Sequence, residues 1–252
     1  MPRKPSETAV DRRSSRRNGS KATGVTTVLL GSAIVVYLFF TNPNPQTFES
    51  YHFVNTGLCL FLPLFAILLF LPEDPQKFGL QKGDRRQGLL WSFGLWAAML
   101  PLLAFVSWLP EFRHTYLDRY LSQWLGSMGP VYNGSRVNLH ALVYYELAMG
   151  FYMFCWEFFF RGFLLFGLAT TKLGEKGALV VQALPFMLLH WSLVHGASKP
   201  WLEVVGSLPA ALILGFVALR TRSFFYGFVA HWAVSATLDL ILLRPFIFPR
   251  LG

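Results

Sequence analysis

The chain has 252 residues, of which 54% are hydrophobic and only 14% are charged, and its mean hydropathy is +0.43. A soluble domain usually carries about 25% charged residues, because its surface faces water. The composition excludes a disordered chain and a soluble globular enzyme, and it indicates that most of the chain lies in lipid.

Basic residues gather at the N-terminus of the chain. Seven of the 22 Lys and Arg residues lie within the first 21 positions and supply much of the net charge of +9. A segment of this composition cannot bury a core, so we expect residues 1–23 to form a disordered cytoplasmic tail. This tail suits the anionic headgroups of a lipid bilayer. We expect no nucleic-acid partner.

Seven stretches of the chain are long and apolar enough to cross a bilayer core, which takes about 20 residues of helix. We therefore expect an all-α fold, a polytopic membrane bundle of about seven transmembrane helices. The first three helices form an N-terminal group within residues 24–109. Residues 110–139 form an extracytoplasmic loop, and residues 244–252 form a C-terminal tail. The expected spans are residues 24–41, 51–71, 88–109, 140–170, 177–195, 201–220 and 223–243.

The fourth stretch, residues 140–170, is too long for one straight span. Its helix would reach about 45 Å, whereas the hydrocarbon core is about 30 Å thick. We expect this helix to tilt or kink, with Gly150 as the hinge.

Basic residues between the spans predict the orientation. If the N-terminus is cytoplasmic, 15 Lys and Arg residues fall on the cytoplasmic side and six on the other side. Cytoplasmic segments normally carry the excess. We therefore expect a multi-pass integral membrane protein with its N-terminus in the cytoplasm and its C-terminus outside, located in a bacterial cytoplasmic membrane.

Ionisable side chains inside the spans are the strongest indication of a functional site, because a charge in lipid is costly. Away from the ends of the spans, none of them lies within the first three, so the chain divides into an apolar N-terminal half and a C-terminal half with a polar lining. The residues concerned are Glu146, Glu157, Arg161, His190, Glu203, His231 and Asp239.

The spacing of these residues brings several of them together. Glu157 and Arg161 are four residues apart, so they share a helix face and can pair. Ser235 and Asp239 follow His231 on one face of the last span. Glu157 and His190 lie about 20 Å from the cytoplasmic ends of their helices, and His231 lies about 14 Å from that side. These depths are compatible with a single site near the middle of the bilayer.

The expected site combines a carboxylate, a guanidinium and two imidazoles. A carboxylate beside a histidine can activate water, and a second histidine with a hydroxyl donor can stabilise an oxyanion. This chemistry suits hydrolysis of an amide bond without a covalent intermediate. Glu157, His190 and His231 could instead bind zinc and leave one position open for water. A third interpretation of Glu157 and Arg161 is an ion pair that only stabilises the helix.

At these residues the chain resembles the CAAX protease and bacteriocin-processing (Abi) family of intramembrane proteases, which includes the type II CAAX prenyl endopeptidases. The family pattern is Glu-Glu-x-x-x-Arg, then Phe-x-x-x-His, then His-x-x-x-Asn/Asp on successive helices. The resemblance covers residues 140–243 and implies a core with a cavity open to the cytoplasm and a glutamate-activated water. Trp156 replaces the first Glu, and Ser235 replaces the final Asn/Asp. The matching residues are Glu157, Arg161, Phe186, His190 and His231.

We therefore predict an intramembrane endopeptidase that acts on a membrane-associated peptide or protein and needs no cofactor. Glu157 is its expected base, assisted by His190 and oriented by Arg161, while His231 and Ser235 form the oxyanion site. One alternative is a non-proteolytic protein of the same fold, with a role in bacteriocin immunity or as a scaffold. Another alternative is a proton-coupled transporter.

Overall fold

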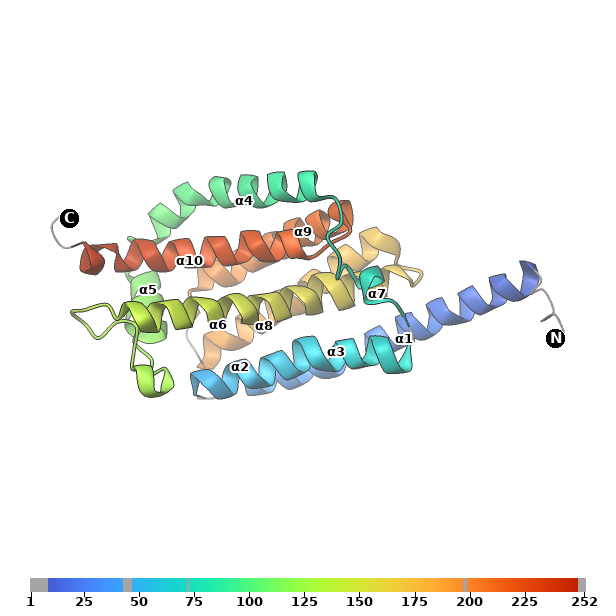
Figure 1. Cartoon of the computed structure of the whole chain (residues 1–252), viewed down its shortest axis with the longest axis horizontal. Helices are drawn as coiled ribbons and strands as arrows, with labels where there is room; N and C mark the ends of the chain where they lie inside the picture. The colour runs from blue at the N-terminus through green and yellow to red at the C-terminus, as the bar shows by residue number, and fades with distance from the viewer. Residues whose placement is uncertain (1–8, 43–46, 72, 197–198, 249–252) are drawn as a thin grey trace, which may run out of the picture.

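The computed structural model describes residues 9–42, 47–71, 73–196 and 199–248. All regular structure in these ranges is helical, and a single isolated β-bridge joins Tyr132 to Val137. The all-α fold is therefore confirmed. The helices lie roughly parallel in one bundle (Figure 1).

The elements follow the expected order along the chain. Several long helices are interrupted by π-helical segments and continue directly beyond them. The elements are α1 (Ala9–Thr41), α2 (Phe48–Thr56), η1 (Gly57–Phe61), α3 (Leu62–Phe65), η2 (Ala66–Phe70), η3 (Pro75–Phe78), α4 (Arg85–Val106), α5 (Pro110–Phe112), η4 (Arg113–Tyr120), η5 (Gly126–Met128), α6 (Leu139–Glu157), η6 (Phe158–Leu164), α7 (Leu165–Ala169), α8 (Gly174–Gly196), α9 (Trp201–Thr221) and α10 (Phe225–Ile247).

Six helices in the described ranges are long and apolar enough to cross a membrane. They match six of the seven expected spans, and α8 occupies the place of the remaining one, so the total of seven stays a prediction. The six are Gly19–Thr41, Phe48–Phe70, Arg85–Val106, Leu139–Ala169, Trp201–Thr221 and Phe225–Ile247.

Helix α1 begins earlier than the sequence suggested. It starts at Ala9, so residues 9–23, which we expected to be disordered, are helical, and residues 1–8 lie outside the described ranges. Figure 1 shows this part of α1 projecting beyond the other helices. Ala, Arg and Lys are good helix formers, and a prediction based on charge alone did not take this propensity into account.

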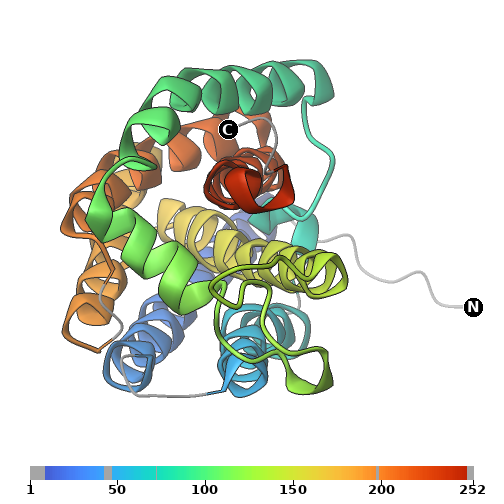
Figure 2. The same ribbon diagram turned by 90° about the vertical axis from the view of Figure 1, so that its left-hand side faces the viewer.

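The segment from Leu139 to Ala169 lies at the centre of the bundle. In an apolar stretch of 18 residues within this segment, 83% of the residues are buried, whereas the corresponding stretches of the other five candidate spans are 17–39% buried. Figure 2 shows this segment, formed by α6, η6 and α7, with other helices around it. Phe158, Phe159, Phe160 and Phe163 are completely buried there and form much of the core.

We expected the kink of this long segment at Gly150, but the helix is not interrupted there. Gly150 is helical, and a Cβ added to it would lie 2.8 Å from the Trp232 ring of α10, so this glycine allows close helix packing. The segment instead changes to π-helix at Phe158–Leu164, directly after Glu157. Such bulges are frequent at functional sites.

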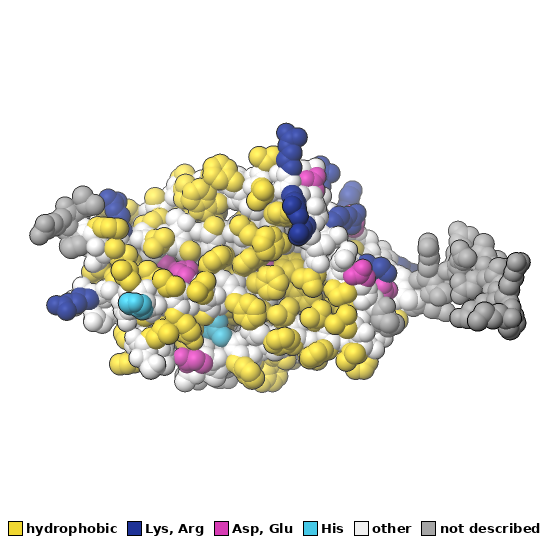
Figure 3. All heavy atoms as spheres, viewed as in Figure 1, with side chains coloured by type: hydrophobic (Ala, Val, Ile, Leu, Met, Phe, Trp, Pro, Cys, Tyr) yellow, Lys and Arg dark blue, Asp and Glu magenta, His cyan; other side chains and the backbone are white. Residues whose placement is uncertain are grey.

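The outer surface of the bundle suits a lipid environment. Large apolar side chains are exposed along several helices, among them Phe53 at 82%, Leu69 at 71% and Phe93 at 65%. In Figure 3 hydrophobic side chains cover the middle of the visible face, and the Lys and Arg side chains lie toward its two ends. Water would not solvate such a surface, whereas lipid would.

Two glycines of α4 allow a direct test of the packing against α10. A Cβ on Gly88 would lie 2.3 Å from the Tyr226 ring, whereas a Cβ on Gly94 would have nothing within 4 Å. We expect Gly88→Ala to lower the free energy of unfolding by about 1–3 kcal/mol, because the added methyl group overpacks the contact. Gly94→Ala, the matched control, should change it little. Thermal unfolding in detergent measures both, and equal effects would contradict this packing.

Candidate active site

The site is built around the carboxylate of Glu157, the last residue of α6. Its side chain is completely buried, and so is that of Arg161, which lies within the π-helical segment η6. Arg161 Nε lies 3.3 Å from Glu157 Oε2. The pairing expected from their spacing is therefore present, across the start of the π-helix.

His231 of α10 reaches the second oxygen of the same carboxylate. Its Nδ1 lies 2.8 Å from Glu157 Oε1. A carboxylate oxygen accepts hydrogen bonds, so Nδ1 carries the proton and Nε2 is left for other partners. Both oxygens of Glu157 thus face a cation or a donor. A carboxylate that orients an imidazole in this way is a recurrent arrangement in hydrolytic sites.

Gly227 of α10 lies beside the carboxylate of Glu157. It is one turn before His231, and a Cβ at Gly227 would stand 3.6 Å from Glu157 Oε2, in ordinary van der Waals contact. The carboxylate therefore packs against α10 at this position.

Phe186 of α8 connects the ion pair to the second histidine. The guanidinium of Arg161 lies over the Phe186 ring, 4.0 Å from its centroid, in a cation–π contact. The carbonyl of Phe186 accepts a hydrogen bond of 2.9 Å from His190 Nδ1, and the two rings are 4.5 Å apart. The Phe186 ring also lies 6.3 Å from that of His231. One phenylalanine therefore contacts all three polar side chains.

The hydrogen bond to the Phe186 carbonyl also fixes the tautomer of His190. A carbonyl can only accept, so Nδ1 holds the proton and Nε2 of the neutral ring presents a lone pair. The side chains of His190 and His231 both have Nε2 as their free nitrogen. Such a pair can accept or return protons.

Ser235 is less closely connected to the site. It is half-buried, one turn beyond His231 on α10, and its hydroxyl makes no hydrogen bond to another residue in the described part of the chain. The structure therefore brings together Glu157, Arg161, His190 and His231 and leaves Ser235 beside them with an unused donor.

The remaining ionisable residues form two separate groups. Glu146 of α6 and Asp239 of α10 are neighbouring carboxyl groups, two or more turns away from Glu157 and His231 along these helices. Glu203 of α9 is paired with Lys199 and accepts a hydrogen bond of 2.6 Å from the Tyr116 hydroxyl. Asp239, which lies on the face of His231, therefore belongs to another cluster.

The Glu203 cluster holds the segment after α4 against the start of α9. Burial alone would lower the pKa of Lys199, but the Glu203 carboxylate outweighs burial and holds that pKa well above its usual range. Burial and the same carboxylate also raise the pKa of the Tyr116 hydroxyl. Lys199 therefore stays charged and Tyr116 stays a donor at neutral pH, so the cluster is a permanent link.

The side chains do not form the zinc site considered as an alternative. No group of three or more His, Cys, Asp and Glu side chains in the described ranges is arranged to hold a metal ion. Both oxygens of Glu157 are already in contact with Arg161 and His231. The arrangement of Glu157, His190 and His231 therefore does not fit a bound zinc ion, and we derive no step through one.

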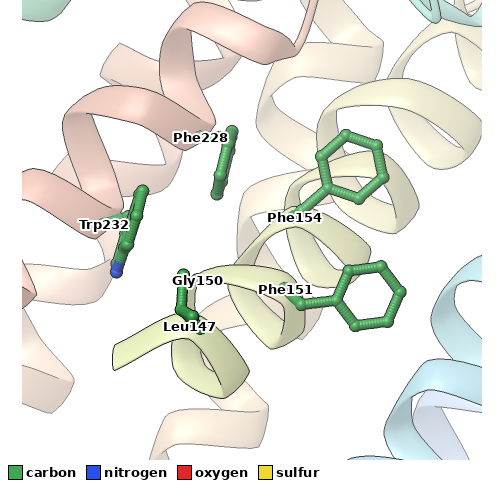
Figure 4. Close-up of a pocket in the computed structure, with 6 residues that line it drawn as sticks. All are labelled: Leu147, Gly150, Phe151, Phe154, Phe228 and Trp232. Atoms are coloured by element: carbon green, nitrogen blue, oxygen red, sulfur yellow. The ribbon is translucent and has the colours of Figure 1, made fainter. Parts of the chain in front are cut away.

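An apolar groove lies between α6 and α10 beside this site (Figure 4). Its volume is about 320 Å³, and aromatic side chains dominate its walls. Figure 4 shows the rings of Phe228 and Trp232 side by side on α10, facing Gly150 and Phe154 of α6. The groove contains none of the four clustered residues, although Trp232 directly follows His231. It is lined by Leu147, Gly150, Phe151, Phe154, Phe228 and Trp232.

Sequence reasoning missed a polar network next to the site. The indole Nε1 of Trp156 donates to Asn55 Oδ1 at 3.1 Å, and Asn55 exchanges hydrogen bonds with Asn42. All three side chains are buried. Two asparagines in or next to apolar stretches were the available signal, but they carry no charge and so did not stand out among the ionisable residues.

The core of the chain matches a known family. Residues 138–237 match the family model described as Type II CAAX prenyl endopeptidase Rce1-like. This part of the chain is similar to the type II CAAX prenyl endopeptidases. The resemblance drawn from the sequence is thus confirmed, and the matched range includes Glu157, Arg161, His190, His231 and Ser235.

The family and the helices together characterise the chain as a multi-pass integral membrane protein. Comparisons with curated proteins and with solved structures gave no match. The reaction is therefore inferred from the geometry of the site and from the family.

Proposed function

We propose that this chain is an intramembrane endopeptidase that cleaves a membrane-associated peptide or protein with an activated water. The observation that carries the proposal is the contact of 2.8 Å between His231 Nδ1 and Oε1 of the buried Glu157. Together with the family match over residues 138–237, it supports hydrolysis at a glutamate–histidine pair.

Glu157 acts through His231 in this proposal. Its two oxygens already face Arg161 and His231, so His231 Nε2 is the atom that takes a proton from water. The carboxylate stabilises the imidazolium that forms, and Arg161 keeps the carboxylate in place. The sequence suggested Glu157 as the direct base, whereas these contacts favour His231 as the group that exchanges the proton.

The proposed reaction is hydrolysis of a peptide bond. The water oxygen bonds to the carbonyl carbon while its proton moves to His231 Nε2, and the same proton later passes to the departing amine as the C–N bond breaks. Nε2 of His190 accepts a hydrogen bond from the other O–H of the water and orients it, and that hydrogen stays on the new carboxyl group. The Ser235 hydroxyl, which has no partner within the described part of the chain, is the donor available to the oxyanion.

A non-proteolytic protein of the same fold is the second candidate. The complete burial of Glu157 and Arg161 favours it, because a buried ion pair within one helical segment can have a purely structural role. Trp156 also replaces one of the two acidic residues of the family pattern. Under this interpretation the polar cluster contributes to stability and specificity of packing, and no peptide is cut.

We further propose a bacterial cytoplasmic membrane as the location, with the N-terminus in the cytoplasm. The excess of Lys and Arg residues between alternate helices supports this orientation. A bacterial host is supported by the resemblance to the Abi family, because some of its members take part in bacteriocin maturation or immunity.

The proposed function is tested by comparing membrane proteomes of cells that carry the wild-type chain or Glu157→Gln. We expect a set of protein termini to disappear in the variant, because Gln cannot stabilise the imidazolium of His231. His231→Gln should remove the same termini. Thermal unfolding of each purified variant confirms that it is folded. Identical termini in cells carrying wild type and a folded variant would favour the non-proteolytic candidate.

A further inference from the structure

Trp156 occupies a position between the N-terminal helices and the catalytic cluster. It is the penultimate residue of α6, only 3% exposed, and it precedes Glu157. Glu157 faces His231 of α10, whereas the Trp156 ring packs against His190 and Phe186 of α8. Trp156 and Glu157, which are neighbours on α6, thus contact different helices.

One end of the Trp156 side chain is fixed by a buried amide network. Its indole N–H donates to Asn55 Oδ1 at 3.1 Å, and Asn42 Nδ2 also donates to that oxygen at 3.4 Å. In return Asn55 Nδ2 donates to Asn42 Oδ1 at 3.2 Å and to the Tyr51 carbonyl at 2.9 Å. Because these amides are buried and well paired, the network is rigid and costly to disturb.

The other end of Trp156 meets the imidazole of His190. The ring centroids are 6.1 Å apart and the planes are at 89°, an edge-to-face contact of the kind that aromatic pairs favour. Trp156 makes a second contact of 6.1 Å with Phe186, whose ring lies 4.5 Å from His190. The three rings therefore pack against one another, and His190 contacts both of the others.

These contacts supply what the single hydrogen bond of His190 lacks. Its Nδ1 bonds to the Phe186 carbonyl four residues earlier, and this bond sets the direction of Nε2 only while it stays formed. Rotation of the His190 side chain about its χ angles would break it. The Trp156 ring packs against the imidazole and restricts that rotation, and Asn55, outside the site, sets the orientation of Trp156.

We infer that Trp156 is a positioning residue that aims His190 Nε2 at the Glu157–His231 pair, with Asn42 and Asn55 as its anchor. An indole cannot accept a proton, so Trp156 takes no part in the chemistry and acts through His190. The inference rests on the proposed function for its effect on turnover. Its effect on the reactivity of His190 is independent of that function.

The inference is tested with Trp156→Ala and Trp156→Phe in the full-length chain. Carbethoxylation of histidines by diethyl pyrocarbonate is followed by mass spectrometry, with the exposed His140 as the internal standard. We expect the rate at His190 to rise at least fivefold in Trp156→Ala, with that at His231 unchanged, and the rise to be smaller in Trp156→Phe, which keeps a ring. Equal changes at both histidines, or none at His190, would overturn the inference.

Turnover of a cleaved substrate provides the second measurement. We expect Trp156→Ala to lower kcat at least tenfold with KM changed less than twofold, and Trp156→Phe to recover most of kcat. Trp96→Phe is the matched control, since it removes an indole hydrogen bond of 3.0 Å to Thr237 away from His190. A larger change in KM than in kcat, or an equal loss in the control, would contradict positioning. Absence of cleavage by the wild-type chain would instead refute the proposed function, and the labelling would still decide the role of Trp156.

Discussion

Arg161→Met should lower the free energy of unfolding by about 3–5 kcal/mol, because it leaves the buried carboxylate of Glu157 without its cationic partner. Both side chains are completely buried, so water cannot replace the lost contact. Replacing both partners, as in Glu157→Gln with Arg161→Met, should restore most of this stability, since a neutral pair has no charge to solvate. Denaturant unfolding in detergent micelles measures these differences.

The matched control is another i,i+4 pair of the same chain. Lys77 and Glu73 form an ion pair in which the side chain of Lys77 is 67% exposed. Lys77→Met should cost only about 0–1 kcal/mol, because exposed pairs are screened by water. If Arg161→Met were no more harmful than Lys77→Met, the charges at Glu157 and Arg161 would not be sealed from solvent, and the buried ion pair would be contradicted.

The double variant also separates the two candidate functions. A structural ion pair can be replaced by neutral residues without loss of function, whereas a catalytic carboxylate cannot. The variant with both substitutions should therefore be stable and inactive if the chain is a protease. A stable variant that retains the cellular function of the wild type would show that the pair serves only the fold.

Ionisable residues are costly in lipid, and this explains why the sequence could single out residues that the structure brings together. Glu157, Arg161, His190 and His231 stood out because each is costly in a membrane. Helical rise alone gave them similar depths, and the structure places all four in one cluster. The family pattern then matched the same residues in the same order.

Structural features that depend on backbone hydrogen bonding or on packing could not be predicted from the hydropathy and charge of the sequence. The π-helix at Phe158–Leu164 has no signature in hydropathy, so the irregularity was assigned to Gly150, whose small size instead accommodates Trp232. The network of Asn42, Asn55 and Trp156 joins residues more than 100 positions apart. Neither spacing on one helix nor the charge of a residue reveals such a contact.

His231→Ala should reduce kcat by about 10²–10⁴-fold, the range expected when a general base is removed. The variant loses the nitrogen proposed to exchange the proton and leaves Glu157 Oε1 without its donor. Ser235→Ala should reduce kcat by about 10²–10³-fold if its hydroxyl stabilises the oxyanion. His140→Ala, on the exposed first turn of α6, should leave turnover unchanged. Steady-state kinetics with a purified substrate measure all three.

Whether the effects of Glu157→Gln and His231→Ala on kcat are additive distinguishes two roles for the carboxylate, as a group acting through His231 or as the direct base. If Glu157 passed its effect through His231, Glu157→Gln and His231→Ala would each disable the same unit, and their combination would cost little more than either change alone. If Glu157 were the direct base and His231 only an oxyanion donor, the two losses would approach the sum of their separate free energies. The contact of 2.8 Å between them favours the first result, because two groups joined in this way act as one.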